Sequence, residues 1–396
     1  MTITTTRPHK GEVSGATYSY EGGLKKAIDI AEFYGFHLIP PLKVEKEDKE
    51  LSLKHRCPEH HLAVIRKCAQ EEPHKTNGAA FFVHTKKVPY KQKLELRLDI
   101  VGDKESSAES LLLQAACSIL KEYGYDDLTA SVNSVGGKES TSLFIQAITS
   151  YYRSRLGELE TTCREAFKES VFSPLRCTHE SCRQLRHDAP QSLNFLSELS
   201  KQHFKEVLEY LEVSDISYVI NPSLVGSEHY TTRTLFQIGT PGTQESTDDT
   251  VHDRVLAWGE RYDLLSKKAG CRKSIPMIHM TLDLNIEDPD EQFVAKKKAE
   301  RIPEIYMIHV GFPAKLQTLR IIENLRKARI KIQSQIHAIT VSEQMERARL
   351  MGIPVVIIIG QKEVFEGTAL VRHMHTNRQD TIPQEKLALY LKEVMA

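Results

Sequence analysis

The fold is decided by one stretch near the middle of the chain, Asn221-Pro-Ser-Leu-Val-Gly-Ser-Glu-His-Tyr-Thr-Thr-Arg-Thr-Leu-Phe-Gln237. Its Asn-Pro dipeptide marks a turn. Residues 216–219 before the turn and residues 232–237 at the end of the stretch have the composition of β-strands. The stretch therefore predicts two strands joined by a loop that carries polar side chains.

Strands and helices also follow one another in the part of the chain that precedes this stretch. Residues 94–101 and 128–135 alternate between apolar and polar side chains, which predicts half-buried strands. Apolar residues at helical spacing predict helices at 23–35, 107–123, 141–155 and 189–211. The helix at 107–123 is predicted to be amphipathic. Residues 45–93 are mostly polar, and within them only residues 62–68 predict part of a helix.

The end of the chain has a different pattern. Residues 288–302 are charged and contain prolines, which predicts a linker. Beyond the linker, strands are predicted at 305–310, 330–332, 354–359 and 369–374, and helices at 314–328, 342–351 and 383–394. The continuous apolar strand at 354–359 predicts a sheet covered on both faces. We therefore predict a core domain at 1–287, a linker at 288–302 and a small α/β domain at 303–396.

Composition excludes several classes of protein. The chain has 396 residues, 40% of them hydrophobic and 27% charged, with a formal net charge of zero. This profile is typical of globular proteins, and no apolar run approaches the roughly 18 residues of a membrane span. The seven cysteines are an odd number and widely spread, which favours the cytoplasm. Cys163, Cys177 and Cys182 match no paired zinc pattern, so no metal site is predicted, with a structural zinc as the alternative.

Several segments resemble, in order and in spacing, the motifs of histidyl-tRNA synthetases. The opening stretch is similar to the family segment Leu-Val-Arg-Gly-Leu-Asp-Tyr-Tyr-Thr, and Gly259-Glu-Arg-Tyr-Asp-Leu-Leu265 to its Gly-Gly-Arg-Tyr-Asp loop. Further similar segments lie at 132–136, 173–176, 353–363 and 372–379. The resemblance implies a class II synthetase fold, in which an antiparallel sheet with flanking helices precedes an α/β anticodon-binding domain. It also implies a homodimer whose interface includes residues 35–41.

The resemblance assigns remnants of an amino-acid pocket to five residues. Glu59 matches the glutamate that holds the substrate's amino group in that family, Asp99 a pocket glutamate and Glu95 a pocket glutamine. His229 and Tyr230 match positions that line the same pocket. Each has an ordinary alternative: a carboxylate at a helix start for Glu59, an exposed strand face for Glu95 and Asp99, and a repacked loop for His229 and Tyr230.

At three positions that match the family, the residues that would bind ATP are missing. Activation of an amino acid needs cations that neutralise the triphosphate. Residues 81–93 contain no arginine where the family has Phe-Arg-x-Glu, Gly226 replaces the signature arginine, and Asn285 replaces the arginine that stacks on adenine. Ile278 and Leu282 replace small residues that make room for ATP, and the simplest description of this segment is an apolar strand that faces the core. Because a lost cation deletes a transition-state contact, we predict that the chain does not activate an amino acid.

Several basic residues remain as candidates for other roles. Arg261 is the best-matched surviving cation, and Lys86, Lys87 and Arg97 are the other candidates for a replacement clamp. Lys86 and Lys87 lie in a basic run that predicts either a solvated loop or a weak RNA contact. A second basic group at the end of the helix 314–328 predicts either RNA contact or an interaction with the helix dipole. This group consists of Arg326, Lys327, Arg329 and Lys331.

These observations together favour a histidyl-tRNA synthetase-like protein without aminoacylation activity, acting as a tRNA-binding, histidine-binding or regulatory protein. The alternatives are a divergent active histidine–tRNA ligase, a protein similar to the regulatory subunit of ATP phosphoribosyltransferase, and a dimeric scaffold. No cofactor is expected, and ATP and Mg²⁺ are expected only for an active ligase. The expected partners are a second copy of the chain, tRNA or tRNA-like RNA, and histidine, with no membrane.

Overall fold

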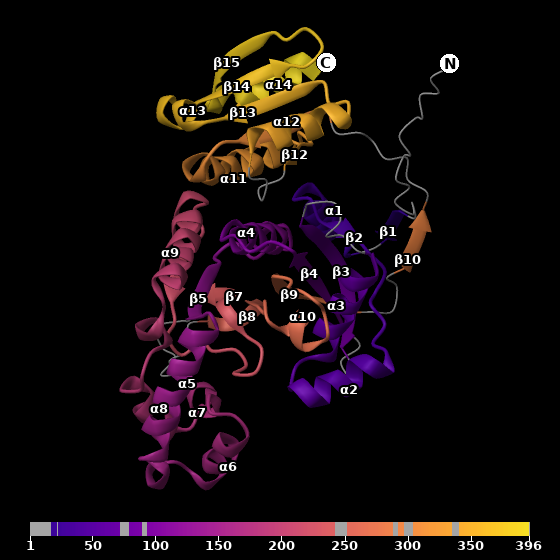
Figure 1. Cartoon of the computed structure of the whole chain (residues 1–396). Coiled ribbons are helices and arrows are strands. Elements are labelled where there is room, and N and C mark those ends of the chain that lie inside the picture. The colour runs from indigo at the N-terminus through magenta and orange to yellow at the C-terminus, as the bar shows by residue number, and fades with distance from the viewer. Residues whose placement is uncertain are drawn as a thin grey trace, which may run out of the picture.

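The computed structural model describes residues 17–21, 23–71, 79–88, 93–241, 252–287, 292–296, 304–334 and 340–395. Its strands form an eight-stranded sheet, a five-stranded sheet and a two-stranded ribbon (Figure 1). The large sheet has the order β2 (His37–Leu38), β3 (Ala80–Val88), β4 (Lys93–Val101), β9 (Met277–Glu287), β8 (His252–Arg261), β7 (Thr232–Pro241), β5 (Thr129–Gly136) and β6 (Tyr218–Ile220). The ribbon pairs β1 (Thr17–Glu21) with β10 (Gln292–Lys296).

The large sheet is antiparallel across its centre, from β3 to β5, and only the edge strands β2 and β6 pair in parallel. Antiparallel strands alternate their side chains between two faces. On β4, Leu96, Leu98 and Ile100 therefore join one hydrophobic core, while Arg97 and Asp99 project to the opposite face. The predicted mixed fold with a large antiparallel sheet is confirmed.

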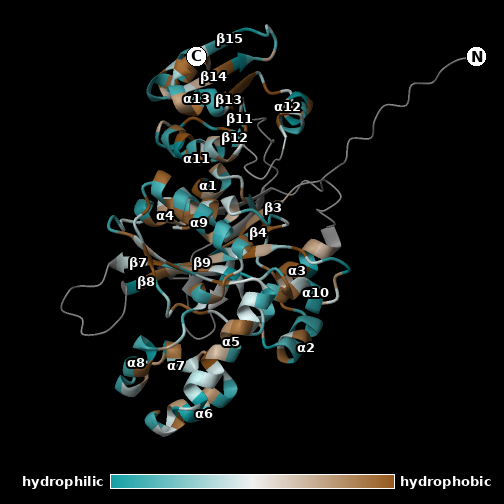
Figure 2. Ribbon diagram, turned by 60° about the vertical axis from the view of Figure 1, so that its left-hand side comes forward, coloured by the Kyte–Doolittle hydropathy of each residue, from teal (hydrophilic) through white to brown (hydrophobic). Residues whose placement is uncertain are grey.

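One layer of helices covers the apolar face of this sheet. It contains α1 (Lys25–Phe33), α4 (Ser107–Glu122) and α9 (Glu198–Val213), which lie between the sheet and the C-terminal part of the chain (Figure 2). On the other side of the sheet lie α2 (Lys46–His55), α3 (Glu59–Glu71), α5 (Lys138–Arg153), α6 (Thr161–Glu169), α7 (Ser173–Arg176), α8 (Glu180–His187) and α10 (Leu265–Lys268). No helix in the described ranges is long and apolar enough to cross a bilayer.

The C-terminal part is a second α/β unit. Its sheet has the order β12 (Gln333–Ser334), β11 (Ile305–His309), β13 (Val355–Ile359), β14 (Thr368–His373) and β15 (Gln379–Pro383). Its helices are α11 (Phe312–Lys327), α12 (Val341–Leu350), α13 (Gln361–Glu366) and α14 (Leu387–Met395). β13 pairs in parallel with β11 and antiparallel with β14. Because helices lie on both sides of it, β13 is apolar along its length, as its sequence predicted.

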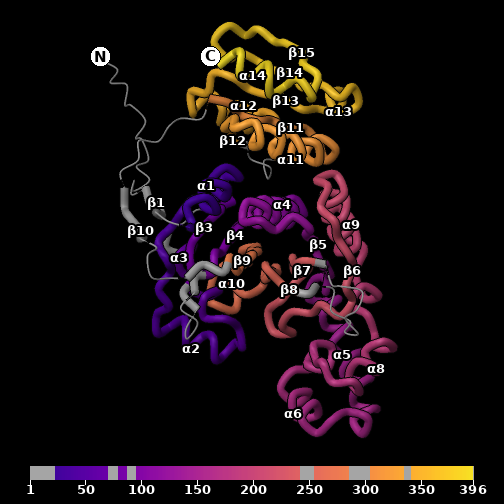
Figure 3. The backbone as a smooth tube through the Cα atoms, turned by 180° about the vertical axis from the view of Figure 1, so that it is seen from behind, coloured from indigo at the N-terminus to yellow at the C-terminus, as the bar shows by residue number. Residues whose placement is uncertain are grey.

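The C-terminal unit is seated on the helix layer of the large sheet. The ring of Phe312 on α11 meets the ring of Tyr210 on α9 edge-on, 5.2 Å between centroids. The amide Nε2 of Gln114 on α4 donates to the main-chain oxygen of Leu319 at 2.9 Å. Glu323 accepts hydrogen bonds from the hydroxyls of Tyr34 and Ser118. Figure 3 shows α11 of the C-terminal unit next to α4 and α9.

The contact between the two units corrects the prediction for α4. Its sequence predicted an amphipathic helix, yet every residue from 107 to 120 is buried. The sheet covers one side of α4, and α1, α9 and α11 cover the remaining sides. A helix that looks half-polar in the sequence is therefore central in the fold, because Ser118 and Gln114 contact a second unit whose residues lie 205 positions away in the chain.

Other elements were missed or misplaced by the sequence patterns. Residues 45–93 were predicted to be irregular apart from 62–68, but they contain α2, the whole of α3 and β3. The predicted helix 189–211 is a 3₁₀ turn, Ser192–Phe195, followed by α9, whose cap Ser197 accepts from the Ser200 amide. The strand predicted at 330–332 lies at Gln333–Ser334. Of the predicted linker, 292–296 forms β10, and the rest lies outside the described residues.

Candidate functional site

The polar face of the large sheet carries a row of buried charged and aromatic side chains. Asp99 on β4 pairs in register with His279 on β9, and His279 pairs with Glu260 on β8. On the next rung, Arg97 of β4 lies opposite His84 of β3. Residues in register on neighbouring strands project to the same face. The sheet therefore brings together five polar side chains from four strands.

Arg97 and Asp99 form an ion pair at the centre of this row. The Arg97 Nε atom lies 3.0 Å from one Asp99 oxygen, and its Nη2 lies 3.1 Å from the other. The Asp99 carboxylate also contacts His84 Nε2 at 2.9 Å and accepts from the Tyr262 hydroxyl at 3.3 Å. Burial raises the pKa of Asp99, but Arg97 and His84 outweigh it and hold that pKa well below its usual value. The exposed-face alternative for Asp99 is wrong.

Two histidines at the start of α3 close over the ion pair. His60 and His61 are 7% and 3% exposed. The His61 ring lies 4.4 Å from the Tyr262 ring and 4.6 Å from the His279 ring, and its Nδ1 lies 3.3 Å from Arg97 Nη2. Burial, and then the charge of Arg97, lower the pKa of His60 to about 2 and those of His61 and His279 well below their usual value. These imidazoles are therefore neutral at physiological pH.

The loop of the opening stretch packs against the same row at Gly226. A Cβ atom added there would collide with Thr231 and with a carboxylate oxygen of Glu260. The hydroxyls of Thr231 and Tyr230 both donate to Glu260. Burial nevertheless raises the pKa of Glu260. The carboxyl group of Glu260 and its two donors thus occupy the space beside Gly226, and no longer side chain fits there.

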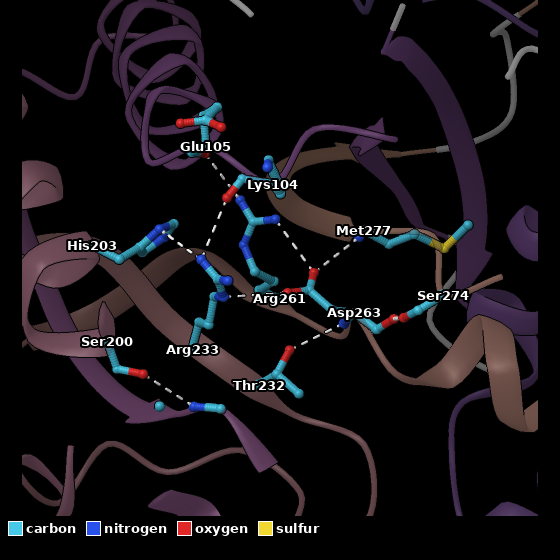
Figure 4. A network of polar contacts seen from close by, with 12 residues as sticks. Lys104, Glu105, Ser200, His203, Thr232, Arg233, Arg261, Asp263, Ser274 and Met277 are labelled. Atoms are coloured by element: carbon cyan, nitrogen blue, oxygen red, sulfur yellow. Dashed lines mark hydrogen bonds and ion pairs between the residues drawn. The ribbon is translucent and has the colours of Figure 1, made fainter. Parts of the chain in front are cut away.

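Arg261 lies on the opposite face from Glu260 in a second network, with no exposed surface (Figure 4). Its Nε and Nη2 atoms donate to the two oxygens of Glu109 at 2.9 and 2.6 Å, and its Nη1 donates to the main-chain oxygen of Asp103 at 2.7 Å. His203 Nε2 contacts the same Glu109 carboxylate at 2.7 Å. Arg261 therefore fastens β8 to the start of α4, and its guanidinium has no surface with which to meet a ligand.

Three other predicted pocket residues that the structure describes, Glu59, Glu95 and His229, make no hydrogen bond with the Arg97–Asp99 ion pair. Glu59 is exposed at the first position of α3, beside the positive end of the helix dipole. Glu95 lies 3.5 Å from Lys86 Nζ in a cross-strand ion pair. His229 is about one-third exposed and borders an open hollow of about 340 Å³. That hollow is lined by Arg56, Glu169, Ser170, Arg176, Ser227, Glu228 and His229.

Comparison with known proteins identifies the lineage of this arrangement. The family model described as "Anticodon binding domain" matches residues 304–394. The chain is 24% identical to the histidine–tRNA ligase of Rippkaea orientalis over 396 residues, 96% of this chain and 87% of that protein. It is 24% identical to the histidine–tRNA ligase of Clostridium botulinum (strain Langeland) over 312 residues, 76% of this chain and 70% of that protein. Along most of its length the chain is similar to histidine–tRNA ligases. Among solved structures, apo Staphylococcus aureus histidyl-tRNA synthetase matches with 21% identity, a TM-score of 0.49 and coverage of 92% and 93%.

Strand β9 has its apolar side chains in the core, as expected for this segment. Ile278 and Leu282 lie in the hydrophobic core beside α4, on the face of the sheet opposite to the buried polar row. His279 and Thr281 are the β9 residues on the polar face, both buried. The side chain of Asn285 lies outside the described residues. The buried His279 ring therefore fills space on the polar face, and the sequence patterns did not single out this residue.

Sequence reasoning also missed the role of Glu260. It replaces the second glycine of the family's Gly-Gly-Arg-Tyr-Asp loop, a change visible in the quoted motif. Only the register of β8 and β9 shows that its side chain reaches Thr231 and the backbone at Gly226. Arg97 was one of four possible clamp residues, and the structure shows it paired with Asp99. The signal in the sequence that pointed to this site was the replacement of a family glycine by Glu260, not the presence of a remaining cation such as Arg97.

The basic residues proposed for RNA contact have unequal surroundings. Arg326 donates to Glu323 at 2.8 and 2.9 Å and is only 19% exposed, so it is held at the contact between the two units. Lys327, Arg329 and Lys331 are exposed. The side chain of Lys87 lies outside the described residues. An exposed group of three cations remains at the C-terminal end of α11.

Proposed function

We propose that this chain is a member of the histidyl-tRNA synthetase family that binds tRNA and does not activate an amino acid. The observation that carries the proposal is the pair of contacts at Gly226: Glu260 fills the space where the family's signature arginine would extend. An arginine at that point would stabilise charge on the reacting phosphate, and a carboxyl group cannot. The exchange therefore removes a cation and also fills the space that its side chain would need.

The residues on the polar face do not fit ATP. Bending a triphosphate needs free guanidinium or ammonium groups and carboxylates that hold Mg²⁺. On this face, Arg97 is already neutralised by Asp99. Arg261, on the opposite face of the sheet, is neutralised by Glu109. The neighbouring histidines are neutral and give no positive charge. We therefore derive no reaction step through ATP or Mg²⁺.

Histidine as the ligand is supported less well than RNA. The position of a bound imidazole in a pocket around Asp99 and Tyr262 is taken by the ring of His61, which is stacked 4.4 Å from Tyr262. A free histidine would have to displace this ring. The match of residues 304–394 to an anticodon-binding domain instead supports tRNA as the ligand, and the exposed group of Lys327, Arg329 and Lys331 supplies charge for its phosphates.

Two assays on the full chain test the proposal. Pyrophosphate exchange with histidine and ATP should stay at background. Exchange above background would refute the proposal that the chain does not activate an amino acid. Binding of bulk tRNA should weaken about tenfold when Lys327, Arg329 and Lys331 are replaced by alanine, with a shallower dependence on salt. Alanine at three exposed lysines of α2, namely Lys46, Lys49 and Lys54, is the matched control. Absence of tRNA binding by the unmodified chain would refute the proposal that the chain binds tRNA.

A homodimer in the cytoplasm is part of the same proposal. The position of β2 at the edge of the large sheet supports the dimer, because the class II motif that residues 35–41 resemble meets its partner there in the related family. None of the seven cysteines forms a disulfide, which supports a reducing compartment. A mass of twice 45.0 kDa by light scattering is expected, and a monomer at micromolar concentration would contradict it.

A further inference from the structure

The helices farthest from the C-terminal unit hold a cluster of sulfur atoms. α6, α7 and α8 lie together at one end of the molecule (Figures 1 and 3). They bring the Sγ atoms of Cys163, Cys177 and Cys182 within 4.8 Å of one another. The Cys163 and Cys177 sulfurs are 3.5 Å apart. Within the described ranges, no other group of three such side chains is close enough to share a metal ion.

A histidine completes the set of donors. The Nδ1 atom of His179 lies 3.0 Å from the Cys177 sulfur and 3.2 Å from the Cys163 sulfur. A tetrahedral zinc ion with Zn–S near 2.3 Å and Zn–N near 2.0 Å separates its ligands by about 3.5–3.8 Å. The separations among Cys163, Cys177 and His179 are a few tenths of an ångström shorter, and the Cys182 sulfur lies within 4.8 Å of the other two sulfurs. Small movements of the side chains therefore admit the ion. Sequence spacing hid this set, because Cys163 is distant from Cys177-x-His179-x-x-Cys182.

The backbone presents each donor from the end of a short helix. Cys163 is the third residue of α6, Cys177 caps the C-terminus of α7, His179 caps the N-terminus of α8, and Cys182 is the third residue of α8. These helices have nine, four and eight residues. Isolated helices shorter than about 12–15 residues are marginal in water. A shared ion would join three elements that could not persist separately.

We propose that Cys163, Cys177, His179 and Cys182 bind one Zn²⁺ ion as a closed structural site. Three thiolates and one imidazole in a tetrahedral arrangement match the preference of zinc rather than of Mg²⁺ or Ca²⁺. All four positions are filled by the protein, so no position is open for water or substrate. The ion stabilises the helical unit by ligation and does not take part in chemistry.

The site also connects to the hollow beside the buried row. The segment between Cys163 and Cys177 contains Ser170, whose hydroxyl donates to Glu228 at 3.0 Å, and Arg176, whose Nη2 donates to Ser170 at 3.1 Å. Arg176 and Ser170 both line the hollow. Zinc holds both ends of this segment, and so fixes one wall of the hollow against the loop of the opening stretch.

The test is the metal content of the full chain purified under reducing conditions without added chelator. We expect about one zinc per chain, and the visible absorption of tetrahedral cobalt thiolate when Co²⁺ replaces it. Cys177→Ser and Cys182→Ser should lose the metal, whereas Cys271→Ser, in a separate part of the fold, should keep it. His179→Cys should retain zinc, and His179→Ala should bind it at least about tenfold more weakly.

Three results would overturn the site. The first is a metal-free chain that also fails to bind added Zn²⁺ or Co²⁺; because it uses the unmodified protein, it does not depend on the folding of a variant. The second is loss of metal from Cys271→Ser to the same degree as from Cys177→Ser. The third is a Cys163–Cys177 disulfide under reducing conditions, seen as a loss of two thiols in a titration. Neither zinc nor its absence bears on the exchange and tRNA assays, so the two proposals fail independently.

Discussion

Replacing Arg261 by methionine should destabilise the whole core domain. The guanidinium makes two bonds to Glu109, two to the main-chain oxygens of Asp103 and Glu105, and one to Asp263. Methionine fills most of the volume but leaves the Glu109 charge buried without its principal partner. Breaking a buried pair on one side costs about 3–5 kcal/mol. With a denaturant slope of about 3 kcal/mol/M, the urea midpoint should fall by about 1–1.7 M.

The assay is equilibrium urea unfolding followed by the fluorescence of Trp258, which lies on the same strand as Arg261. Arg153→Met, at an exposed arginine of α5, is the control and should change stability by less than about 0.5 kcal/mol. Adding Glu109→Gln to Arg261→Met should recover part of the loss, because the uncompensated charge is then gone. An Arg261→Met midpoint equal to that of Arg153→Met would refute the structural role, and would return Arg261 to the list of ligand-binding cations.

Three further outcomes are expected. His60, His61 and His279 have pKa values below their usual 6.5 in the folded chain, so below pH 6.5 the unfolded chain binds more protons. Stability therefore falls as the pH falls from 8 to 5.5, by about 1 kcal/mol for each histidine. Urea midpoints measured at both pH values test this, and equal midpoints would show that the histidines are not buried as neutral rings. Gly226→Ala should cost about 1–3 kcal/mol through its collision with Thr231 and Glu260, whereas Gly157→Ala, where a Cβ meets nothing within 4 Å, should be neutral in the same unfolding assay. Phe312→Ala should loosen the contact between the two units and speed amide hydrogen exchange in α4. The control Phe365→Ala, at a ring that is 92% exposed, should leave this exchange unchanged. Unchanged exchange in α4 of Phe312→Ala would mean that Phe312 does not hold the units together.

Much of the framework followed from the sequence because the responsible signals are local. The alternation on β4 and the apolar run of β13 each predicted a strand that the structure contains. Helix α1 ends where Gly35 adopts a positive φ of 91°, a conformation that glycine accepts without strain. β3 was missed because its lysines and His84 conceal a strand that is stabilised by pairing with β4 along its whole length. Pairing is not encoded in one segment, so no window of sequence could reveal it.

The sequence by itself determined which residue types stand at the positions of an ancestral pocket, including the glycine at 226 and the glutamate at 260. Tertiary structure alone decided what those residues do. It buried Arg97 against Asp99, committed Arg261 to Glu109, and carried His179 to the sulfur of Cys163. The physical reason is that charge, hydrogen bonding and metal ligation act over a few ångströms, whereas their partners lie from 2 to more than 150 residues apart in the chain. Composition fixes the available groups, and only the packed sheet and helices fix their distances.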